Sequence, residues 1–440
     1  MIPSVDEMLS LVPSATRPSY RGRVEVISGV LVEAAGLPAA LGELCRIDRG
    51  PLDPIYAEVV GFRGASSLLM PHGDLAGIAP MQEVYALGRP FAIPITHDFV
   101  GRVVDGFGAP IDDGPRIHSR GPMRSVRQAA PAALSRAPID TPLETGIRVI
   151  DSLLTIGSGQ RLGIFAGSGV GKSTLLGQAT RGTKADVVVC CLVGERGREV
   201  RSFLDNVLGP EGRAKSVVVV ATSDRPPIER FTAPFVALTI AEFLRDQGLE
   251  VLFVMDSVTR FAAASREVGL AAGEPPTVRG YPPSFFAEMP KLVERLGRTE
   301  TGSITGLLTV LLDGDDPHDP VADTLRGLLD GHIMLDRKLA HSGHFPAIDV
   351  PASLSRLMPE LVDSEHMARA AQVREWISAH ADARDLLDIG AYKPGANPLL
   401  DNAIQRMPAI NHFLRQADDA TPFAETCELL SLIADAGVSQ

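Results

Sequence analysis

The chain of 440 residues is poor in cysteine and has no long apolar run. Its cysteines are Cys45, Cys190, Cys191 and Cys427. They show no C-x-x-C spacing, and two of them are adjacent in an apolar segment, so reduced cytosolic thiols fit best. No apolar run approaches the ~18 residues that a membrane-spanning helix needs, and the first residues lack the basic start of a secretion signal. We therefore expect a cytoplasmic protein that is neither secreted nor membrane-spanning.

Positive charge is also scarce relative to negative charge, and the formal net charge is −12 at pH 7. This acidic balance argues against a large nucleic-acid-binding surface, so we expect no nucleic-acid partner. Internal repeats and low-complexity segments are absent from the sequence. With 45% hydrophobic and 22% charged residues, the composition is that of an ordinary globular protein. The length predicts two or three domains.

The most informative stretch is an apolar segment, residues 162–166, that runs into a glycine-rich turn and then into a helix. This order is the context that a phosphate-binding loop requires. The glycines let successive backbone N–H groups converge on one point, and the helix adds its positive end. Ala166 replaces the first glycine of the G-x-x-x-x-G-K-[ST] motif, which adds only one methyl group at a strand end. The residues expected to hold phosphate are Gly167, Ser168, Gly169, Val170, Gly171, Lys172, Ser173 and Thr174.

Two carboxylates follow apolar strands and are expected to face this loop. Lys172 is placed to reach the β and γ phosphates of a bound triphosphate, and the Ser173 hydroxyl is placed for Mg²⁺. Asp256 ends an apolar run and can hold Mg²⁺ through water. Glu195 follows the apolar run 187–193, where a carboxylate facing the γ-phosphate can deprotonate the attacking water.

The chain changes its pattern three times. Between Gly22 and about Gly88, short β-branched runs predict a small antiparallel barrel, with strands expected at 23–27, 30–34, 55–60 and 67–70. Strands and helices alternate from about residue 145 to 350, and the apolar runs 187–193, 217–220, 251–255 and 307–312 predict a doubly wound parallel sheet. Residues 356–440 predict a helical cap with interruptions at Pro394–Gly395 and Pro408.

Six segments together carry a family resemblance: residues 166–175, 194–200, 256–262, 273–284, 329–333 and 346–350. In these the sequence resembles the ATPase of type III protein export. That family comprises the flagellar export ATPase and its injectisome counterpart, both relatives of the catalytic subunits of rotary ATP synthases. The resemblance covers about residues 20–440. It implies an N-terminal arm (1–20), a β-barrel (21–90), a RecA-like α/β ATPase core (91–355, with an ordered connector at 91–144) and a C-terminal α-helical domain (356–440).

The resemblance also implies roles for single residues. Glu195 would be the general base, Arg196 and Arg260 would lie near the γ-phosphate, and Arg356 would be the arginine finger that enters a neighbouring subunit's site. Such fingers are worth about 10³ to 10⁵ in rate. Phe345 would stack on adenine. Phe413 would close the other side of the base, with a place in the core as an equal alternative.

For the whole protein, the resemblance implies an Mg-ATP hydrolase that forms a homo-hexameric ring for type III export, with flagellar export favoured. The ring would sit at the cytoplasmic face of the inner membrane. The implied partners are a dimeric regulator or stator protein met by residues 1–20, a coiled-coil stalk protein in the pore, the membrane export gate and chaperone-bound export substrates. The loop 275–283 would face that pore, with a purely structural turn as the alternative.

Several alternatives stay open. The injectisome ATPase is the nearest, followed by the catalytic subunit of a rotary ATP synthase. A nucleotide-binding subunit that does not hydrolyse ATP is disfavoured by Glu195, and a ring-shaped RNA translocase is disfavoured by the acidic balance. The acidic segment between Asp313 and Asp319 resembles a metal site in composition, but its prolines and the family pattern favour an interface loop.

Overall fold

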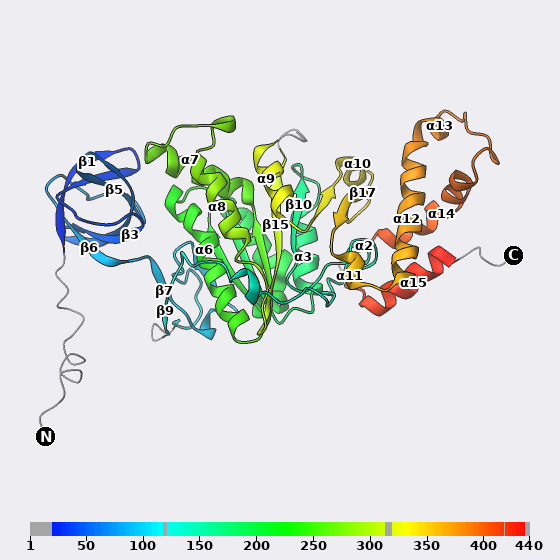
Figure 1. Ribbon diagram of the computed structural model, residues 1–440, viewed down its shortest axis with the longest axis horizontal. Helices are drawn as coiled ribbons and strands as arrows, with labels where there is room; N and C mark the ends of the chain where they lie inside the picture. Colours follow the sequence, from blue (N-terminus) through cyan, green and yellow to red (C-terminus); the bar gives the residue numbers. More distant parts are fainter. Residues whose placement is uncertain (1–19, 118–120, 313–318, 418, 436–440) are drawn as a thin grey trace, which may run out of the picture. The chain divides into compact units, whose positions relative to one another are not determined.

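The computed structural model describes residues 20–117, 121–312, 319–417 and 419–435 (Figure 1). The described chain forms two compact units. One contains the residues up to Ala92 together with Glu267–Pro275, and the other contains Ile93–Arg266 and the chain from Pro276 onward. Of the predicted N-terminal arm and the acidic segment 313–319, only Tyr20 and Asp319 lie within the described residues. Asp319 caps a helix by accepting hydrogen bonds from the N–H groups of Val321 and Ala322.

The first unit contains the predicted barrel, which is closed and antiparallel in the order β1-β2-β5-β4-β3-β6. Inward residues such as Val24, Val32 and Leu69 are fully buried, because alternate positions of each strand face the barrel interior. The strands are β1 (Arg21–Ser28), β2 (Leu31–Ala35), β3 (Glu43–Arg49), β4 (Leu52–Arg63), β5 (Ser66–Pro71) and β6 (Glu83–Pro90).

The second unit is built on a sheet with the order β17-β16-β10-β15-β13-β11-β12-β8. Strands β16 to β8 run parallel, β17 pairs antiparallel with β16, and β14 pairs antiparallel with β15. The fold is therefore the α/β class that the alternation predicted. The strands are β8 (Val103–Asp105), β10 (Arg161–Ala166), β11 (Val187–Val193), β12 (Ser216–Ala221), β13 (Glu250–Asp256), β14 (Gly297–Arg298), β15 (Ser303–Leu311), β16 (Gly331–Leu335) and β17 (Ile348–Ser355).

Helices connect these strands and pack on the sheet (Figure 1). The longest, α6, buries Val236, Ile240 and Leu244, whereas Phe243 is only partly buried. The α-helices of this part are α2 (Arg148–Leu153), α3 (Lys172–Gly182), α4 (Gly197–Ser202), α5 (Gly209–Ala214), α6 (Pro227–Asp246), α7 (Val258–Ala271), α8 (Pro283–Val293), α9 (Pro320–Leu328) and α10 (Arg337–His341). A π-helix, Phe203–Leu208, joins α4 to α5, and short 3-10 turns span His97–Phe99, Ala133–Ser135 and Val278–Gly280.

The connector between the barrel and the core is ordered where it is described. Its strand β8 extends the main sheet, where Val103 and Val104 are buried beside β12. A second pair, β7 (Ala92–Pro94) and β9 (Met123–Ser125), forms a small separate sheet. The connector residues are therefore held by strand pairing as well as by burial of apolar side chains.

The C-terminal helices share one hydrophobic core with the sheet, in which Trp376, Phe413 and Leu430 are buried together with Ile150 of α2. The predicted break at Pro394–Gly395 is present between α13 and α14, but the break predicted at Pro408 is wrong. Pro408 lies inside α14. A proline removes one helical hydrogen bond, and burial of Ala403 and Phe413 on either side holds the helix together. These helices are α11 (Met358–Leu361), α12 (Ser364–Asp382), α13 (Arg384–Asp388), α14 (Pro398–Leu414) and α15 (Phe423–Asp435).

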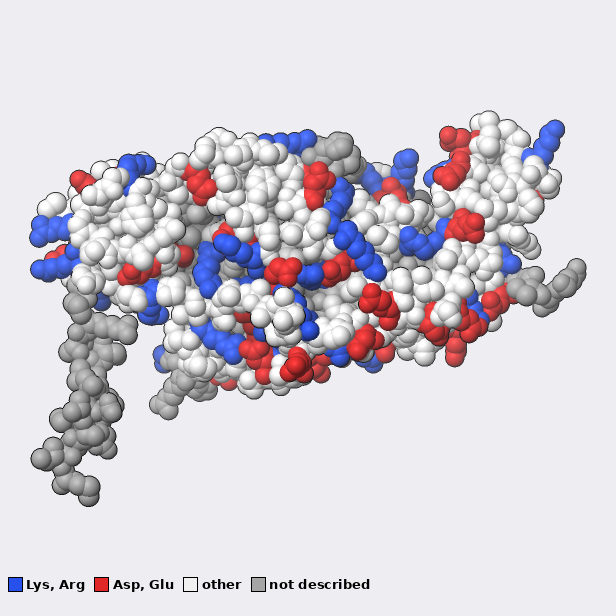
Figure 2. Space-filling model, viewed as in Figure 1, with Lys and Arg blue, Asp and Glu red and all other residues white. Residues whose placement is uncertain are grey.

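The thiols are free, and charges of both signs lie on the drawn face (Figure 2). All four cysteines are free, and Cys45, Cys190 and Cys191 are buried. On the face drawn in Figure 2, acidic and basic side chains are interspersed. Within the described ranges, no helix has the length and apolar character needed to cross a membrane.

Candidate nucleotide site

The phosphate-binding loop has the backbone conformation that its glycines allow. Strand β10 ends at Ala166 and α3 begins at Lys172, with Gly169 at φ 77° and Gly171 at φ 89°. Side chains rarely adopt these positive φ values. A Cβ on Gly171 would also lie only 3.1 Å from Cε1 of Phe345. Gly171 is therefore needed both for the turn and for the close approach of Phe345.

Lys172 and Asp256 form an ion pair at this loop. Their side chains are 11% and 5% exposed, so each charge is largely withdrawn from water and compensated by the other. The Thr309 hydroxyl of β15 donates a second hydrogen bond to Asp256 at 2.9 Å. The parallel strands thus bring a lysine and a carboxylate, far apart in the sequence, to the same edge of the sheet.

Glu195 lies at the same edge, directly after β11, with its side chain 13% exposed. Arg260 of α7 contacts it at 3.5 Å between Nε and Oε1, and also donates to the Gly194 carbonyl at 2.6 Å. Burial, a hydrogen bond with Glu199 and the charge of Asp256 raise the pKa of Glu195 to about 7, against the lowering influence of Lys172 and Arg260. A carboxylate with a pKa near the working pH is suited to take up a proton and release it again.

The two other predicted arginines lie in different places. Arg196 precedes α4 with its side chain 64% exposed, and it pairs with Glu199 at 3.3 Å. Arg356 follows β17, which runs antiparallel to its neighbour β16. It therefore lies where the parallel strands begin, at the edge of the sheet opposite the one that carries the loop. The backbone N–H of Arg356 donates to the carbonyl of Asp330. The Asp330 carboxylate forms an ion pair with Arg161, at the start of β10. Arg161 and Ala166 are the two ends of β10, and they lie roughly 17 Å apart along the strand.

The aromatic residues predicted to hold adenine differ in exposure. Phe345 is 40% exposed beside Gly171, whereas Phe413 is 4% exposed in the core. The guanidinium of Arg148 lies over the Phe413 ring at 5.9 Å. Gln416, three residues further, donates its N–H to the Phe345 carbonyl at 2.9 Å. The structure therefore brings the chain after Phe413 next to Phe345 but keeps the Phe413 ring inside.

The oxygen donors at the loop fit the chemistry that Mg²⁺ prefers. Ser173 is exposed at the first turn of α3, and Asp256 supplies a carboxylate. Among the residues that the structure describes, the loop included, no group of three or more histidine, cysteine, aspartate or glutamate side chains is arranged to hold a metal ion.

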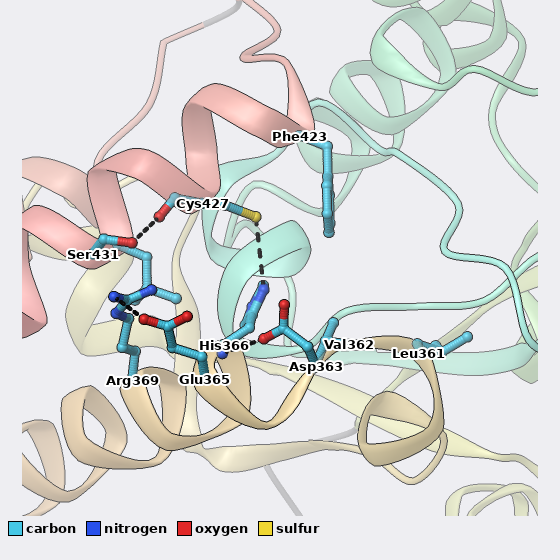
Figure 3. Close-up of a pocket in the computed structure, with 10 residues that line it drawn as sticks. Leu361, Val362, Asp363, Glu365, His366, Arg369, Phe423, Cys427 and Ser431 are labelled. Carbon is cyan, nitrogen blue, oxygen red and sulfur yellow. Dashed lines mark hydrogen bonds and ion pairs between the residues drawn. The ribbon is translucent and has the colours of Figure 1, made fainter.

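A cavity of about 240 Å³ lies between α12 and α15 (Figure 3). His366 lines it, but both ring nitrogens are engaged: Nε2 lies 2.7 Å from the Ser152 carbonyl, and Nδ1 lies 3.6 Å from Sγ of Cys427. Burial raises the pKa of the Cys427 thiol, with Asp151 and Asp363 adding to the effect. These contacts join α12, α15 and α2, so the side chains stabilise packing.

Two residues of the site were missed by sequence reasoning. Glu199 raises the pKa of Glu195 through a hydrogen bond, and Thr309 donates a hydrogen bond to Asp256. Thr309 is the one polar residue in the apolar run 307–312, which was a usable signal. Glu199 follows Glu195 by four residues, but only the turn after β11 shows that the two carboxyls meet.

Comparison with known proteins agrees with this geometry. Residues 146–355 match the ATP synthase alpha/beta family, nucleotide-binding domain, and residues 362–431 match the T3SS EscN ATPase C-terminal domain. The chain is 48% identical over 411 residues to the flagellum-specific ATP synthase of Bacillus subtilis, covering 92% of this chain and 94% of that protein. It is 47% identical over 416 residues to the type 3 secretion system ATPase of Xanthomonas euvesicatoria, covering 94% of each.

A solved structure shows the same similarity in three dimensions. The assembled ATPase EscN from the enteropathogenic E. coli type III secretion system superposes with a TM-score of 0.89 at 43% identity, covering 94% of this chain and all of that one. The protein is therefore an ATP-hydrolysing enzyme, and it belongs to the family of flagellum-specific ATP synthases and type 3 secretion system ATPases.

Proposed function

We propose that this enzyme energises flagellar protein export as a homo-hexameric ring whose ATP sites are shared between neighbouring protomers. The observation that carries the proposal is the separation of Glu195 from Arg356. Glu195 lies with Lys172 and Asp256 at the loop edge of the sheet, whereas Arg356 lies at the opposite edge. A finger so placed serves a second protomer in a head-to-tail ring.

Each half of the site has its own task. The loop N–H groups and Lys172 bind the phosphates, and Phe345 stacks on adenine. The Glu195 carboxylate accepts the proton of the attacking water at Oε1 or Oε2, and Arg260, 3.5 Å from Oε1, orients Glu195. Ser173 and Asp256 would hold Mg²⁺, which would supply positive charge at the phosphate oxygens. Arg356 of the adjacent protomer neutralises the charge that grows on the transferred phosphoryl group.

A solved relative supports one of the proposed partners, the central stalk. EscN has also been solved in complex with its central stalk EscO, and that chain matches this one with a TM-score of 0.87. We propose a coiled-coil stalk in the ring pore here, met by the loop 275–283, where Val278 is 58% exposed. A dimeric regulator on residues 1–20, the export gate and chaperone-bound substrates complete the proposal, with the ring at the cytoplasmic face of the inner membrane.

The division of labour follows the predicted domain boundaries. We propose that the barrel (21–90) serves ring assembly, that the ATPase core (91–355) carries the phosphate-binding half of each shared site, and that the C-terminal helical domain (356–440) begins with the finger Arg356.

Flagellar and injectisome relatives are equally similar to this chain, at 48% and 47% identity. A strain from which the gene for this chain is deleted distinguishes flagellar export from injectisome secretion. Loss of motility and of extracellular flagellin supports flagellar export, whereas a motile strain that no longer secretes injectisome substrates contradicts it.

Mixed rings test the shared site. Glu195→Gln chains keep the finger, and Arg356→Ala chains keep the base, so about a quarter of the junctions in a random equimolar ring regain both groups. Turnover well above that of either parent supports the proposal. A mixture that assembles and stays as inactive as both parents contradicts it.

A further inference from the structure

We propose that Asp330 and Arg161 are positioning residues for the finger Arg356, holding the peptide from which it projects. This inference rests on the proposed function, because it concerns the half of the shared site that one protomer presents to the next. It concerns residues at the far edge of the sheet, away from the phosphate-binding loop.

The base of Arg356 is fixed by main-chain contacts. Its backbone N–H donates to the Asp330 carbonyl at 3.0 Å, and its guanidinium donates from Nη2 to the Arg326 carbonyl at 3.2 Å. Gly331 pairs with Ser355, and a Cβ on Gly331 would lie 2.3 Å from the Leu354 carbonyl oxygen. Strands β16 and β17 can therefore approach this closely only because residue 331 is glycine.

The Asp330 carboxylate is held in turn by Arg161 at both oxygens. Nε of Arg161 lies 2.9 Å from Oδ2, and Nη2 lies 3.1 Å from Oδ1. The backbone N–H of Arg161 also donates to Oδ2, and the N–H of Asp330 donates to the Arg161 carbonyl at 2.8 Å. The side chains are only 19% and 22% exposed, so this bidentate pair is less screened than a surface ion pair.

Further contacts tie the same peptide to its surroundings. The Ser355 hydroxyl, next to the finger, donates to the Thr155 carbonyl at 2.8 Å. The Gln160 side-chain amide donates to that hydroxyl at 3.0 Å and to the Asp330 carbonyl at 3.2 Å. Arg161 also pairs with Glu294 at 2.8 Å. Burial disfavours the charged form of Arg161, but these carboxylates outweigh it and raise its pKa.

The consequence is a rigid base under an exposed side chain. Arg356 has to reach phosphate oxygens across a protomer junction, and a displacement of about 1 Å at a catalytic group can lower the rate about 100-fold. Strand β10 carries Arg161 at one end and the phosphate-binding loop after the other. The Asp330–Arg161 pair therefore connects the finger Arg356 to strand β10. The same strand positions the phosphate-binding loop, which belongs to a different site of the proposed ring.

The test uses full-length Asp330→Asn and Arg161→Lys, with Asp140→Asn as the matched control. Asp140 is a 67% exposed partner of Arg298. For Asp330→Asn we expect kcat to fall about 10- to 100-fold, while the Kd of a fluorescent ATP analogue stays within about threefold. Arg161→Lys keeps the charge but loses the fork, so we expect a smaller fall in kcat. The control keeps its turnover.

Mixing decides where Asp330 acts. Asp330→Asn chains mixed with Glu195→Gln chains should regain turnover, because some junctions combine an intact base with an intact finger. Mixed with Arg356→Ala chains they should not, because both parents are defective on the finger side. Equal recovery in both mixtures, the reverse pattern, or turnover of Asp330→Asn equal to that of the control overturns the inference.

Failures of the two proposals are distinguishable. If the Glu195→Gln and Arg356→Ala reference mixture stays inactive in assembled rings, the shared site is wrong and the inference falls with it. If that mixture recovers but the Asp330 asymmetry is missing, only the inference falls. If neither the Asp330 nor the Arg161 variant assembles, the pair is a folding element and the positioning role is overturned.

Discussion

The two edges of the central sheet are built in opposite ways. At the loop edge, the charged groups Lys172, Asp256 and Glu195 are largely buried and in contact with oppositely charged partners. At the far edge, Arg356 is exposed. The peptide beneath it is held by hydrogen bonds, and its guanidinium makes one hydrogen bond, to the Arg326 carbonyl. A buried group of charges that compensate one another can bind a ligand within one protomer. An exposed arginine on a rigid base needs the surface of a second protomer to complete a site. In the proposed ring, each protomer would present two complementary halves.

The largest expected effect comes from the exposed half. Arg356→Ala should lower kcat by about 10³ to 10⁵, because the phosphoryl charge loses its cation in the transition state. Nucleotide binding should change little, since the loop half is intact. Steady-state kinetics and nucleotide titration check this, with the exposed Arg384→Ala as control. A variant that loses nucleotide binding as strongly as turnover would place Arg356 in its own protomer's site.

The buried half should respond almost as strongly. Glu195→Gln keeps the shape of the side chain but removes its basicity, so we expect kcat to fall by about 10² to 10⁴. Single-turnover hydrolysis in assembled rings measures the step directly. Glu211→Gln, at the exposed start of α5, should behave as wild type. Hydrolysis at the control rate would remove Glu195 from the chemistry.

The sequence predicted the sheet better than the barrel. Strand β11 coincides with the predicted run because every residue of it is apolar and buried. Strands β3 and β6 were missed, since the charged residues on their outward faces break up the apolar pattern. The joining of β8 to the main sheet was missed too, because three residues carry no periodicity of their own.

The site was partly predictable for the same physical reason. Residues at the carboxyl ends of parallel strands meet at one edge, so the proximity of Lys172, Asp256 and Glu195 followed from strand assignments alone. The support of Arg356 did not, because it depends on the antiparallel turn-back of β17. Sequence spacing cannot show which edge such a strand ends on.

A smaller effect should sharpen the contrast at the loop edge. Phe345→Ala removes the half-exposed ring beside Gly171, and loss of a base stack worth about 1–3 kcal/mol should raise KM for ATP about 5- to 150-fold. The finger is untouched, so kcat should stay close to wild type. Phe345→Tyr should restore KM. An unchanged KM in the alanine variant would mean that adenine binds elsewhere.

The smallest effect concerns the pKa of the base. The pKa of Glu195 is raised to about 7, so kcat/KM should rise with pH through that value as the free enzyme loses this proton. Glu199→Ala removes one cause of the raised pKa but leaves burial, which is the larger cause. We expect the acidic limb to move to lower pH by less than about one unit. A limb that moves to higher pH contradicts the assignment.

Dilution tests the complementary halves most directly. Turnover per chain should be measured against chain concentration, with assembly followed by sedimentation in the same buffer. We predict that wild-type turnover falls toward the Arg356→Ala level as rings dissociate, while the variant itself shows no concentration dependence. Full turnover per chain from sedimenting monomers would show that one protomer holds a complete site.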